Sequence, residues 1–126
     1  MSNELILVVE DNDKNRKLAR DVLQVKGYRV IEANSAEIGL QLAAEQRPDL
    51  VLMDIHLPGM NGIQALARLR EAPATRTIPV IAFTASVMPQ DQREITSAGF
   101  DGFVSKPINL KEFLATIAAI LGKAKA

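Results

Sequence analysis

The stretch VLMDIHLPGMNG, residues 51–62, begins as an apolar run, ends that run on an aspartate and then turns through a proline and two glycines. The apolar run predicts a buried strand, and the Pro and Gly residues predict a loop directly after it. A carboxylate at the end of a buried strand costs free energy unless it is paired or binds a metal. The position of Asp54 therefore indicates that other charged groups converge on the same place.

Four further short runs rich in Val, Ile and Leu predict strands, and helical patterns lie between them. Strict alternation of strand and helix, with strands that are apolar throughout, indicates a parallel sheet covered by helices on both faces. The predicted fold class is therefore α/β, a doubly wound parallel sheet of five strands in the order 2-1-3-4-5. The predicted strands are Leu5–Val9, Tyr28–Ala33, Asp49–Met53, Pro79–Phe83 and Asp101–Val104.

Apolar spacing and capping residues place the helices between and after these strands. Leu18, Val22 and Val25 form a stripe on the first predicted helix, which Gly27 ends. A helix over 88–98 offers only Met88, Ile95 and Ala98 to a core, so it should be loosely held. The candidate N-caps are Asn34 or Ser35 for a second helix ending before Pro48, Asn61 for a third, and Asn109 for the last, whose apolar stripe is Leu110, Phe113, Leu114, Ile117, Ile120 and Leu121.

Length and composition exclude several classes of protein. At 126 residues the chain predicts one domain, 1–126 with a core over 4–122. Lys plus Arg and Asp plus Glu balance at 15 each, which gives no basic face for nucleic acid. The sequence has no apolar run long enough for a membrane helix, no secretory signal and no cysteine, so we expect a soluble cytoplasmic protein.

Polar residues follow four of the predicted strands. Glu10 and Asp11 follow the first, Asp54 the third, Thr84 the fourth and Lys106 the fifth. In a sheet of order 2-1-3-4-5 the first and third strands are neighbours at the topological switch point, where ligands bind beyond the carboxyl ends. We therefore expect three carboxylates, a hydroxyl and an ammonium group to meet in one crevice.

This set of groups suits phosphoryl transfer. Three close carboxylates raise one another's pKa values unless a cation lies among them, and an all-oxygen site suits Mg²⁺. A carboxylate such as Asp54 can attack phosphorus and form an aspartyl phosphate. Lys106 as a point charge and Thr84 as a hydroxyl donor would then bind the remaining phosphoryl oxygens.

Four fragments, VVEDN, VLMDIHLPGMNG, IAFTAS and FVSKPIN, in this order and spacing resemble the receiver domain of two-component response regulators, with its (βα)5 flavodoxin-like or CheY-like fold. The match covers nearly the whole chain. The resemblance implies that Asp54 is the phosphoacceptor, charged by a histidine kinase or phosphotransfer protein. It also implies that Glu10 and Asp11 hold Mg²⁺, and that Thr84 and Lys106 are the switch hydroxyl and lysine.

The family pattern implies three further features. The backbone carbonyl of His56 completes the metal site, the Lys106–Pro107 bond is cis, and Phe103 occupies the aromatic switch position. Glu10 stands where many members have Asp, and its longer arm favours coordination through a water. We expect the His56 side chain to face solvent, because one His without a second His or Cys is a poor transition-metal site.

The resemblance also sets expectations for function. We expect a phosphoacceptor switch and not an enzyme, a monomer or weak dimer, most similar to the stand-alone DivK-like cell-cycle regulators. We expect no output domain after Gly122, so the signal would leave by protein contact or onward phosphoryl transfer. The downstream protein is expected on the face of the fourth helix, fifth strand and fifth helix. Neither His56 nor Ser86 is a carboxylate or amide able to orient water, which predicts slow self-hydrolysis.

Three other functions compete with this interpretation. A flavodoxin-like cofactor protein needs a phosphate cradle after the first strand, where this chain is acidic. A phosphatase of the haloacid dehalogenase type needs a second acid where His56 stands. The serious alternative is a receiver-like interaction module that works without phosphorylation, although the intact set of Asp11, Asp54, Thr84 and Lys106 argues against a degenerate site.

Overall fold

Five parallel strands form one sheet in the order β2-β1-β3-β4-β5, as predicted. A computed structural model describes residues 3–85 and 88–125 of the chain. Each strand is joined to the next through a helix, so all carboxyl ends lie at one edge of the sheet. The strands are β1 (Leu5–Val9), β2 (Arg29–Ala33), β3 (Leu50–Asp54), β4 (Val80–Thr84) and β5 (Gly102–Ser105).

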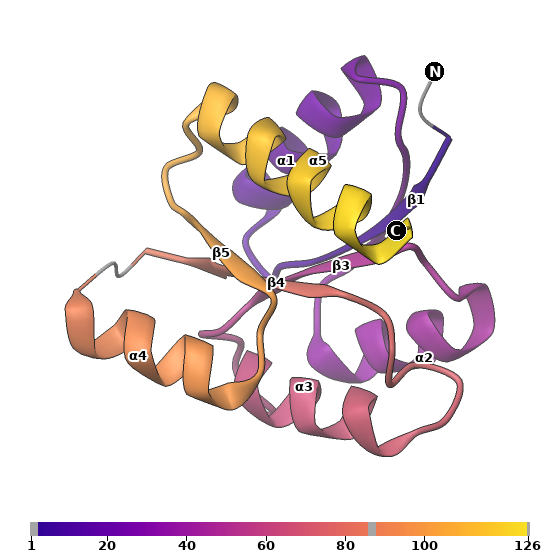
Figure 1. Cartoon of the computed structure of the whole chain (residues 1–126), viewed down its shortest axis with the longest axis vertical. Helices are drawn as coiled ribbons and strands as arrows, with labels where there is room; N and C mark the ends of the chain where they lie inside the picture. Colours follow the sequence, from indigo (N-terminus) through magenta and orange to yellow (C-terminus); the bar gives the residue numbers. More distant parts are fainter. Residues whose placement is uncertain (1–2, 86–87, 126) are drawn as a thin grey trace.

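Helices cover both faces of the sheet. In Figure 1, α1 and α5 lie above the sheet, and α2, α3 and α4 lie below it. Across 3–85 and 88–125, no helix combines the length and the apolar character needed to span a membrane. The helices are α1 (Asp13–Val25), α2 (Ala36–Gln46), α3 (Gly62–Glu71), α4 (Pro89–Ala98) and α5 (Leu110–Lys125).

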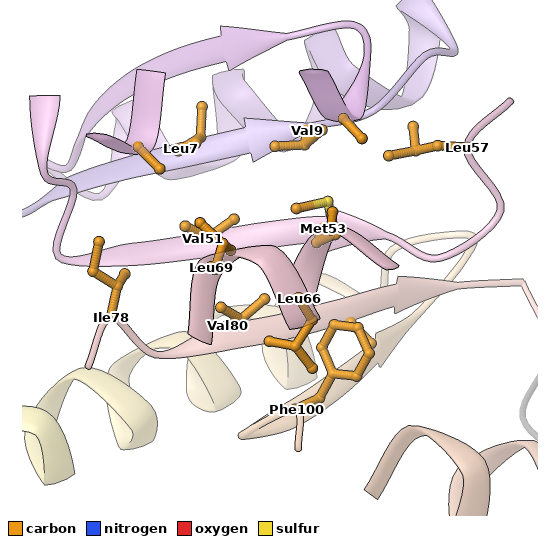
Figure 2. Packing of buried hydrophobic residues seen from close by; sticks show 14 of the residues in the cluster. Leu7, Val9, Val51, Met53, Leu57, Leu66, Leu69, Ile78, Val80 and Phe100 are labelled. Carbon is orange, nitrogen blue, oxygen red and sulfur yellow. The ribbon is translucent and has the colours of Figure 1, made fainter. Parts of the chain in front are cut away.

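Alternation along the strands divides the core into two clusters, because successive side chains of a strand point to opposite faces. In β1, Ile6 and Val8 pack toward α1 and α5, while Leu7 and Val9 pack toward α2 and α3. Figure 2 shows the second of these clusters, with Leu66 and Leu69 of α3 against the sheet. Both faces of the central strands are therefore buried, which explains their continuous apolar sequences.

The predicted bounds of three strands were one residue too early. β3, β4 and β5 each begin and end one residue later than the runs Asp49–Met53, Pro79–Phe83 and Asp101–Val104. The cause is ladder pairing, since Asp54 lies opposite Phe83 and Thr84 lies opposite Ser105. The polar residues are thus the last members of their strands, so the sheet itself fixes their positions.

The predicted apolar stripe of the first helix was wrong. Leu18 is 44% exposed and Val25 is 86% exposed, whereas Ala19 and Leu23 are fully buried. Val22 packs only partly against the core. Residues four apart share a helix face, and the small Ala19 lets α1 approach the sheet closely with Leu23. The predicted stripe therefore lies on a neighbouring face of α1 and not on the face that packs against the sheet.

The helix over 88–98 fully buries only one of the three side chains that its sequence offered to a core. Ile95 is 2% exposed and Ala98 packs partly against the core. Met88 is instead the N-cap of α4 and is 56% exposed. It makes no side-chain capping bond, and Ile95 is the only fully buried side chain of α4, Pro89–Ala98.

The predicted helix caps are confirmed. The Ser35 hydroxyl accepts a hydrogen bond from the Ile38 amide and begins α2. Asn61 and Gln64 form a reciprocal capping box at the start of α3. Asn109 accepts from the Glu112 amide at 3.1 Å and begins α5, although Leu110 of the predicted stripe is 54% exposed.

The start of α3 packs directly on the end of β3. A Cβ added to Gly62 would lie 2.5 Å from the Asp54 carbonyl oxygen and 2.7 Å from Cα of Ile55. Both atoms belong to the backbone, so a side chain at this position must displace the turn that follows Asp54. Glycine is thus required here for close approach.

Gly62→Ala should lower the free energy of unfolding by about 2 kcal/mol, the usual cost of overpacking. Urea unfolding measures this loss. Gly122→Ala is the matched control, because nothing lies within 4 Å of the added Cβ on α5. The control should be stabilised by about 0.5 kcal/mol through helix propensity. Equal stabilities for the two variants would contradict the close packing of α3 on Asp54.

Candidate functional site

The carboxyl ends of β1 and β3 bring three acidic side chains together. One carboxylate oxygen each from Glu10, Asp11 and Asp54 lies within 4.8 Å of the others. Glu10 is fully buried and Asp54 is 2% exposed, whereas Asp11 is exposed to solvent. The predicted acidic cluster therefore exists, with two members inside the protein and one at its surface.

Lys106 is the cation that pairs with the buried carboxylates. Its Nζ lies 2.5 Å from Glu10 Oε1 and 3.1 Å from Asp54 Oδ2. It also lies 4.8 Å from the centre of the Phe83 ring, within the range of a cation–π contact. The cost of ending a buried strand on Asp54 is thus offset by an ammonium group that enters from the residue after β5.

Backbone amides bind the other oxygen of each buried carboxylate. The Asn12 amide donates to Glu10 Oε2 at 3.0 Å, and the His56 amide donates to Asp54 Oδ1 at 2.9 Å. Both carboxylates are therefore fixed from two sides, by Lys106 and by the segment that follows their own strand. Asp11 is the exposed member of the cluster and is open to a ligand from solvent.

The pKa of Glu10 is raised from its usual 4.5 to about 7, mainly by burial and to a smaller extent by the neighbouring Asp54. The Lys106 ammonium and the Asn12 amide act in the opposite direction. For Lys106, burial lowers the pKa, but its bonds to Glu10 and Asp54 outweigh burial, so the pKa is raised above its usual value. Lys106 is therefore charged at neutral pH, while Glu10 titrates close to neutral pH.

The shifted pKa of Glu10 predicts a pH-dependent stability. Between about 4.5 and about 7 the native state binds more protons at Glu10 than the unfolded state does. The free energy of unfolding should therefore fall as pH rises through this window. Urea unfolding of wild type and of Glu10→Gln, each with EDTA at about pH 5, 6, 7 and 8, measures how the free energy of unfolding changes across this window. Glu10→Gln should lose this decline. If the free energy of unfolding of the variant falls with pH as steeply as that of wild type, Glu10 does not titrate in this pH range.

The remaining predicted residues lie around this cluster. Thr84 is buried at the end of β4, and its carbonyl accepts from the Lys106 amide at 2.8 Å. The Lys106–Pro107 bond is cis, as the family pattern implied. The His56 side chain is exposed, as expected. Ser86 lies outside the described residues.

Phe103 is not part of the acidic cluster. It lies on β5 opposite Ala82 and packs partly against the core. It also lines a cleft of about 200 Å³ between β5 and α5, together with Ser105 and Asn109. The predicted switch position therefore lies on β5, next to the cleft between β5 and α5.

Sequence reasoning missed two residues that shape the site. Phe83 supplies the ring beneath Lys106, and the Asn12 amide binds Glu10. The signal for Phe83 was its place directly before Thr84 in a strand next to β3. Asn12 contacts Glu10 through its backbone amide, which every residue except proline has, so the residue type at position 12 could not indicate this contact.

Comparisons with known proteins agree with this geometry. Residues 6–118 match the family model of the response regulator receiver domain. The chain belongs to the response regulator receiver domains. It is 42% identical over 119 residues to the polar-differentiation response regulator DivK of Brucella anthropi, covering 94% of this chain and 97% of DivK. DivK of Brucella ovis matches with the same identity and coverage.

Solved receiver structures share the fold. A response regulator of Chloroflexus aurantiacus superposes with a TM-score of 0.91 at 30% identity, covering 96% of this chain and 99% of that one. The receiver domain of a sensor histidine kinase of Pseudomonas aeruginosa has a TM-score of 0.88 at 30% identity and the same coverage. That domain was crystallised with a magnesium ion coordinated in its active-site cleft.

Membership defines the general role of this receiver domain. It is the receiver domain of a two-component response regulator, similar to DivK, and signalling by phosphorylation is the standard role of this family. Its partners are kinases or other signalling proteins. The predictions of a CheY-like fold and of a DivK-like receiver are therefore confirmed.

Proposed function

We propose that Asp54 accepts the phosphoryl group from a histidine kinase or phosphotransfer protein in a Mg²⁺-dependent reaction, and that the chain acts as a switch and not as an enzyme with an external substrate. The observation that carries this proposal is the buried Asp54 carboxylate, with Lys106 Nζ at 3.1 Å and two further carboxylates beside it. A carboxylate next to a fixed cation can serve as a nucleophile toward phosphorus.

The donor set fits Mg²⁺, which prefers oxygen ligands and retains several waters. Asp11 and Asp54 are the proposed direct ligands, with the backbone carbonyl of His56 beside them. Both oxygens of Glu10 are already engaged, by Lys106 and by the Asn12 amide, which supports a role through water. When bound, the metal would neutralise charge on the phosphoryl oxygens.

The proposed reaction moves one phosphoryl group between two nucleophiles. An oxygen of Asp54 forms a bond to phosphorus as the bond from phosphorus to the donor's imidazole nitrogen breaks, and the imidazole leaves with that electron pair. Lys106 is already within hydrogen-bonding reach of Asp54 and would bind a phosphoryl oxygen as a point charge. Thr84 at the end of β4 would offer its hydroxyl to another.

We propose that phosphorylation shifts α4 and the neighbouring surface, which a downstream protein then reads. The single fully buried side chain of α4, Ile95, supports this, as do the exposed Met88 and Leu110 at the starts of α4 and α5. To shift the ratio of the active to the inactive state from 1:99 to 99:1, a partner must bind the active state more tightly than the inactive state by about 5.5 kcal/mol. Unchanged hydrogen exchange across α4 on phosphorylation would rule out this switch.

We further propose slow loss of the phosphoryl group. His56 is an exposed imidazole and neither a carboxylate nor an amide that could orient water toward Asp54. A purified phosphoprotein should therefore keep its label for much longer than seconds. We also propose that 4–122 form the receiver core and that it acts in the cytoplasm as a monomer or weak dimer, in keeping with a sequence without cysteine.

Intact mass after incubation with acetyl phosphate tests the proposal. With Mg²⁺ the protein should gain one phosphoryl group, and with EDTA it should gain none. Borohydride reduction followed by peptide fragmentation should locate the label at Asp54. No gain despite Mg²⁺ binding would point to a strict kinase requirement. No gain and no Mg²⁺ binding would favour the module that works without phosphorylation.

A further inference from the structure

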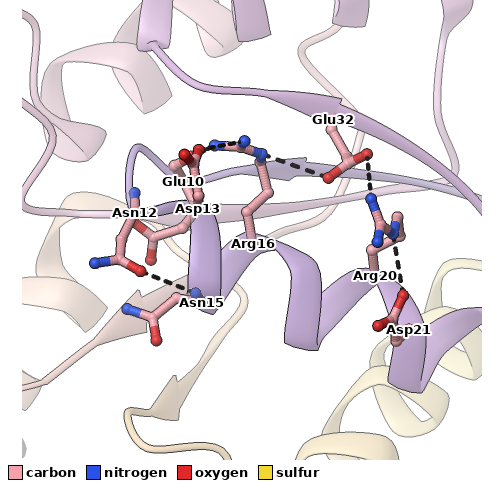
Figure 3. Close-up of polar contacts among 8 residues, drawn as sticks. All are labelled: Glu10, Asn12, Asp13, Asn15, Arg16, Arg20, Asp21 and Glu32. Atoms are coloured by element: carbon pink, nitrogen blue, oxygen red, sulfur yellow. Dashed lines mark hydrogen bonds and ion pairs between the residues drawn. The ribbon is translucent and has the colours of Figure 1, made fainter.

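An arginine of α1 contacts the backbone of the segment that carries the acidic residues. Arg16 Nη1 donates to the carbonyl oxygen of Glu10 at 2.9 Å (Figure 3). Glu10 directly follows β1, and its amide makes a ladder-type bond to the Ala33 carbonyl at 3.0 Å. Arg16 therefore binds the chain where it leaves the sheet and turns toward Asp11.

Arg16 is itself fixed by two carboxylates. Its Nη2 lies 2.6 Å from Asp13 Oδ1 in the first turn of α1, and its Nε lies 3.4 Å from Glu32 Oε1 on β2. The other oxygen of Glu32 lies 3.3 Å from Nη1 of Arg20. Figure 3 shows these groups as a row from Glu10 to Asp21. A guanidinium has a planar fork of donors, so contacts on three sides fix its orientation.

We propose that Arg16 is a positioning residue for the magnesium site. By binding the Glu10 carbonyl and bridging to β2, it sets where Glu10 and Asp11 lie relative to Asp54. This inference rests on the proposed function, because it concerns the metal proposed there. Mg²⁺ requires near-ideal octahedral geometry, and loss of an outer partner of a metal ligand typically weakens binding by about 10-fold to 100-fold.

The sign of the effect separates positioning from simple electrostatics. Arg16 is a cation near an acidic cluster, so as a charge alone it opposes the binding of Mg²⁺. Its removal would then tighten binding. A positioning role predicts the opposite result, weaker binding when the charge is removed.

Arg20 provides the matched control. It lies one turn further along α1 and pairs with the same Glu32, but its other contact is Asp21. Arg20→Ala removes the same charge and the same kind of ion pair without removing the bond to Glu10. Exposed ion pairs contribute little, so Arg20→Ala should bind Mg²⁺ within about 2-fold of wild type.

The experiment is a Mg²⁺ titration of wild type, Arg16→Ala, Arg16→Lys and Arg20→Ala, followed by amide NMR shifts. Arg16→Ala should bind about 10-fold more weakly than wild type. Arg16→Lys should lie between them, since an ammonium can bind the Glu10 carbonyl but lacks the fork that also reaches Asp13 and Glu32. Unchanged or tighter binding in Arg16→Ala would overturn the proposal.

Hydrogen exchange without metal gives a second, independent measurement. The Asn12 amide donates to Glu10, so it reports the position of this segment, and the Val51 amide in the core of the sheet reports global unfolding. Arg16→Ala should accelerate exchange at Asn12 relative to Val51, and Arg20→Ala should not. If wild type binds no Mg²⁺, the proposed metal site fails, whereas this exchange ratio still decides whether Arg16 positions the segment.

Discussion

Asp54→Asn should gain no phosphoryl group from acetyl phosphate, and the pKa of Glu10 should fall below the wild-type value of about 7. An amide is not a nucleophile toward phosphorus, so the first effect is a complete loss. The second follows because Asp54 raises the pKa of Glu10 both as a neighbouring charge and as a hydrogen-bonding partner. Intact mass measures the first effect, and NMR titration of the Glu10 side-chain carboxyl measures the second.

Two readouts on one variant make this prediction specific. Asp21→Asn is the control, because Asp21 is a half-exposed carboxylate on α1 that pairs with Arg20, away from the cluster. It should be phosphorylated like wild type. Phosphorylation that persists in Asp54→Asn would place the acceptor elsewhere, and a Glu10 pKa that stays near 7 would mean that Asp54 does not contribute to raising it.

The fold and the site were largely predictable because both depend on strand order. Parallel strands end at one edge of the sheet, so residues such as Asp54, Thr84 and Lys106 are brought together once the order 2-1-3-4-5 is inferred. Apolar runs of four or five residues locate such strands without knowledge of their exact ends. The error of one residue in β3 and β4 arose because ladder pairing, not hydropathy, decides where a strand ends.

Other features depend on distances that residue types do not encode. Which face of α1 is buried was predicted wrongly, since two stripes were available and the closer approach of Ala19 decided between them. The contacts of Lys106 with Glu10 and of Arg16 with the Glu10 carbonyl depend on the path of the loops after β1 and β5. Long side chains can reach many partners, so their contacts follow from the fold and not from sequence spacing.

Lys106→Met should slow phosphorylation by acetyl phosphate by about 100-fold, since a cation aimed at developing negative charge is lost. It should also remove the ion that pairs with both Glu10 and Asp54. Methionine keeps most of the volume of the side chain, so packing changes little. Rates come from the time course of intact mass, and stabilities from urea unfolding.

The pH dependence of the stability loss identifies its cause. Without Lys106 the pKa of Glu10 should rise above about 7, because the ammonium normally lowers it. In native Lys106→Met, Glu10 would then stay protonated at pH values where Glu10 of native wild type has lost its proton. The free energy of unfolding of the variant should therefore continue to fall above about pH 7. The loss relative to wild type should approach about 3 kcal/mol at alkaline pH, the cost of breaking a buried ion pair, and shrink toward pH 6. The exposed Lys111→Met control should show no such trend. A pH-independent loss in Lys106→Met would instead mean that the lysine stabilises the site through its contact with the Phe83 ring and its aliphatic packing.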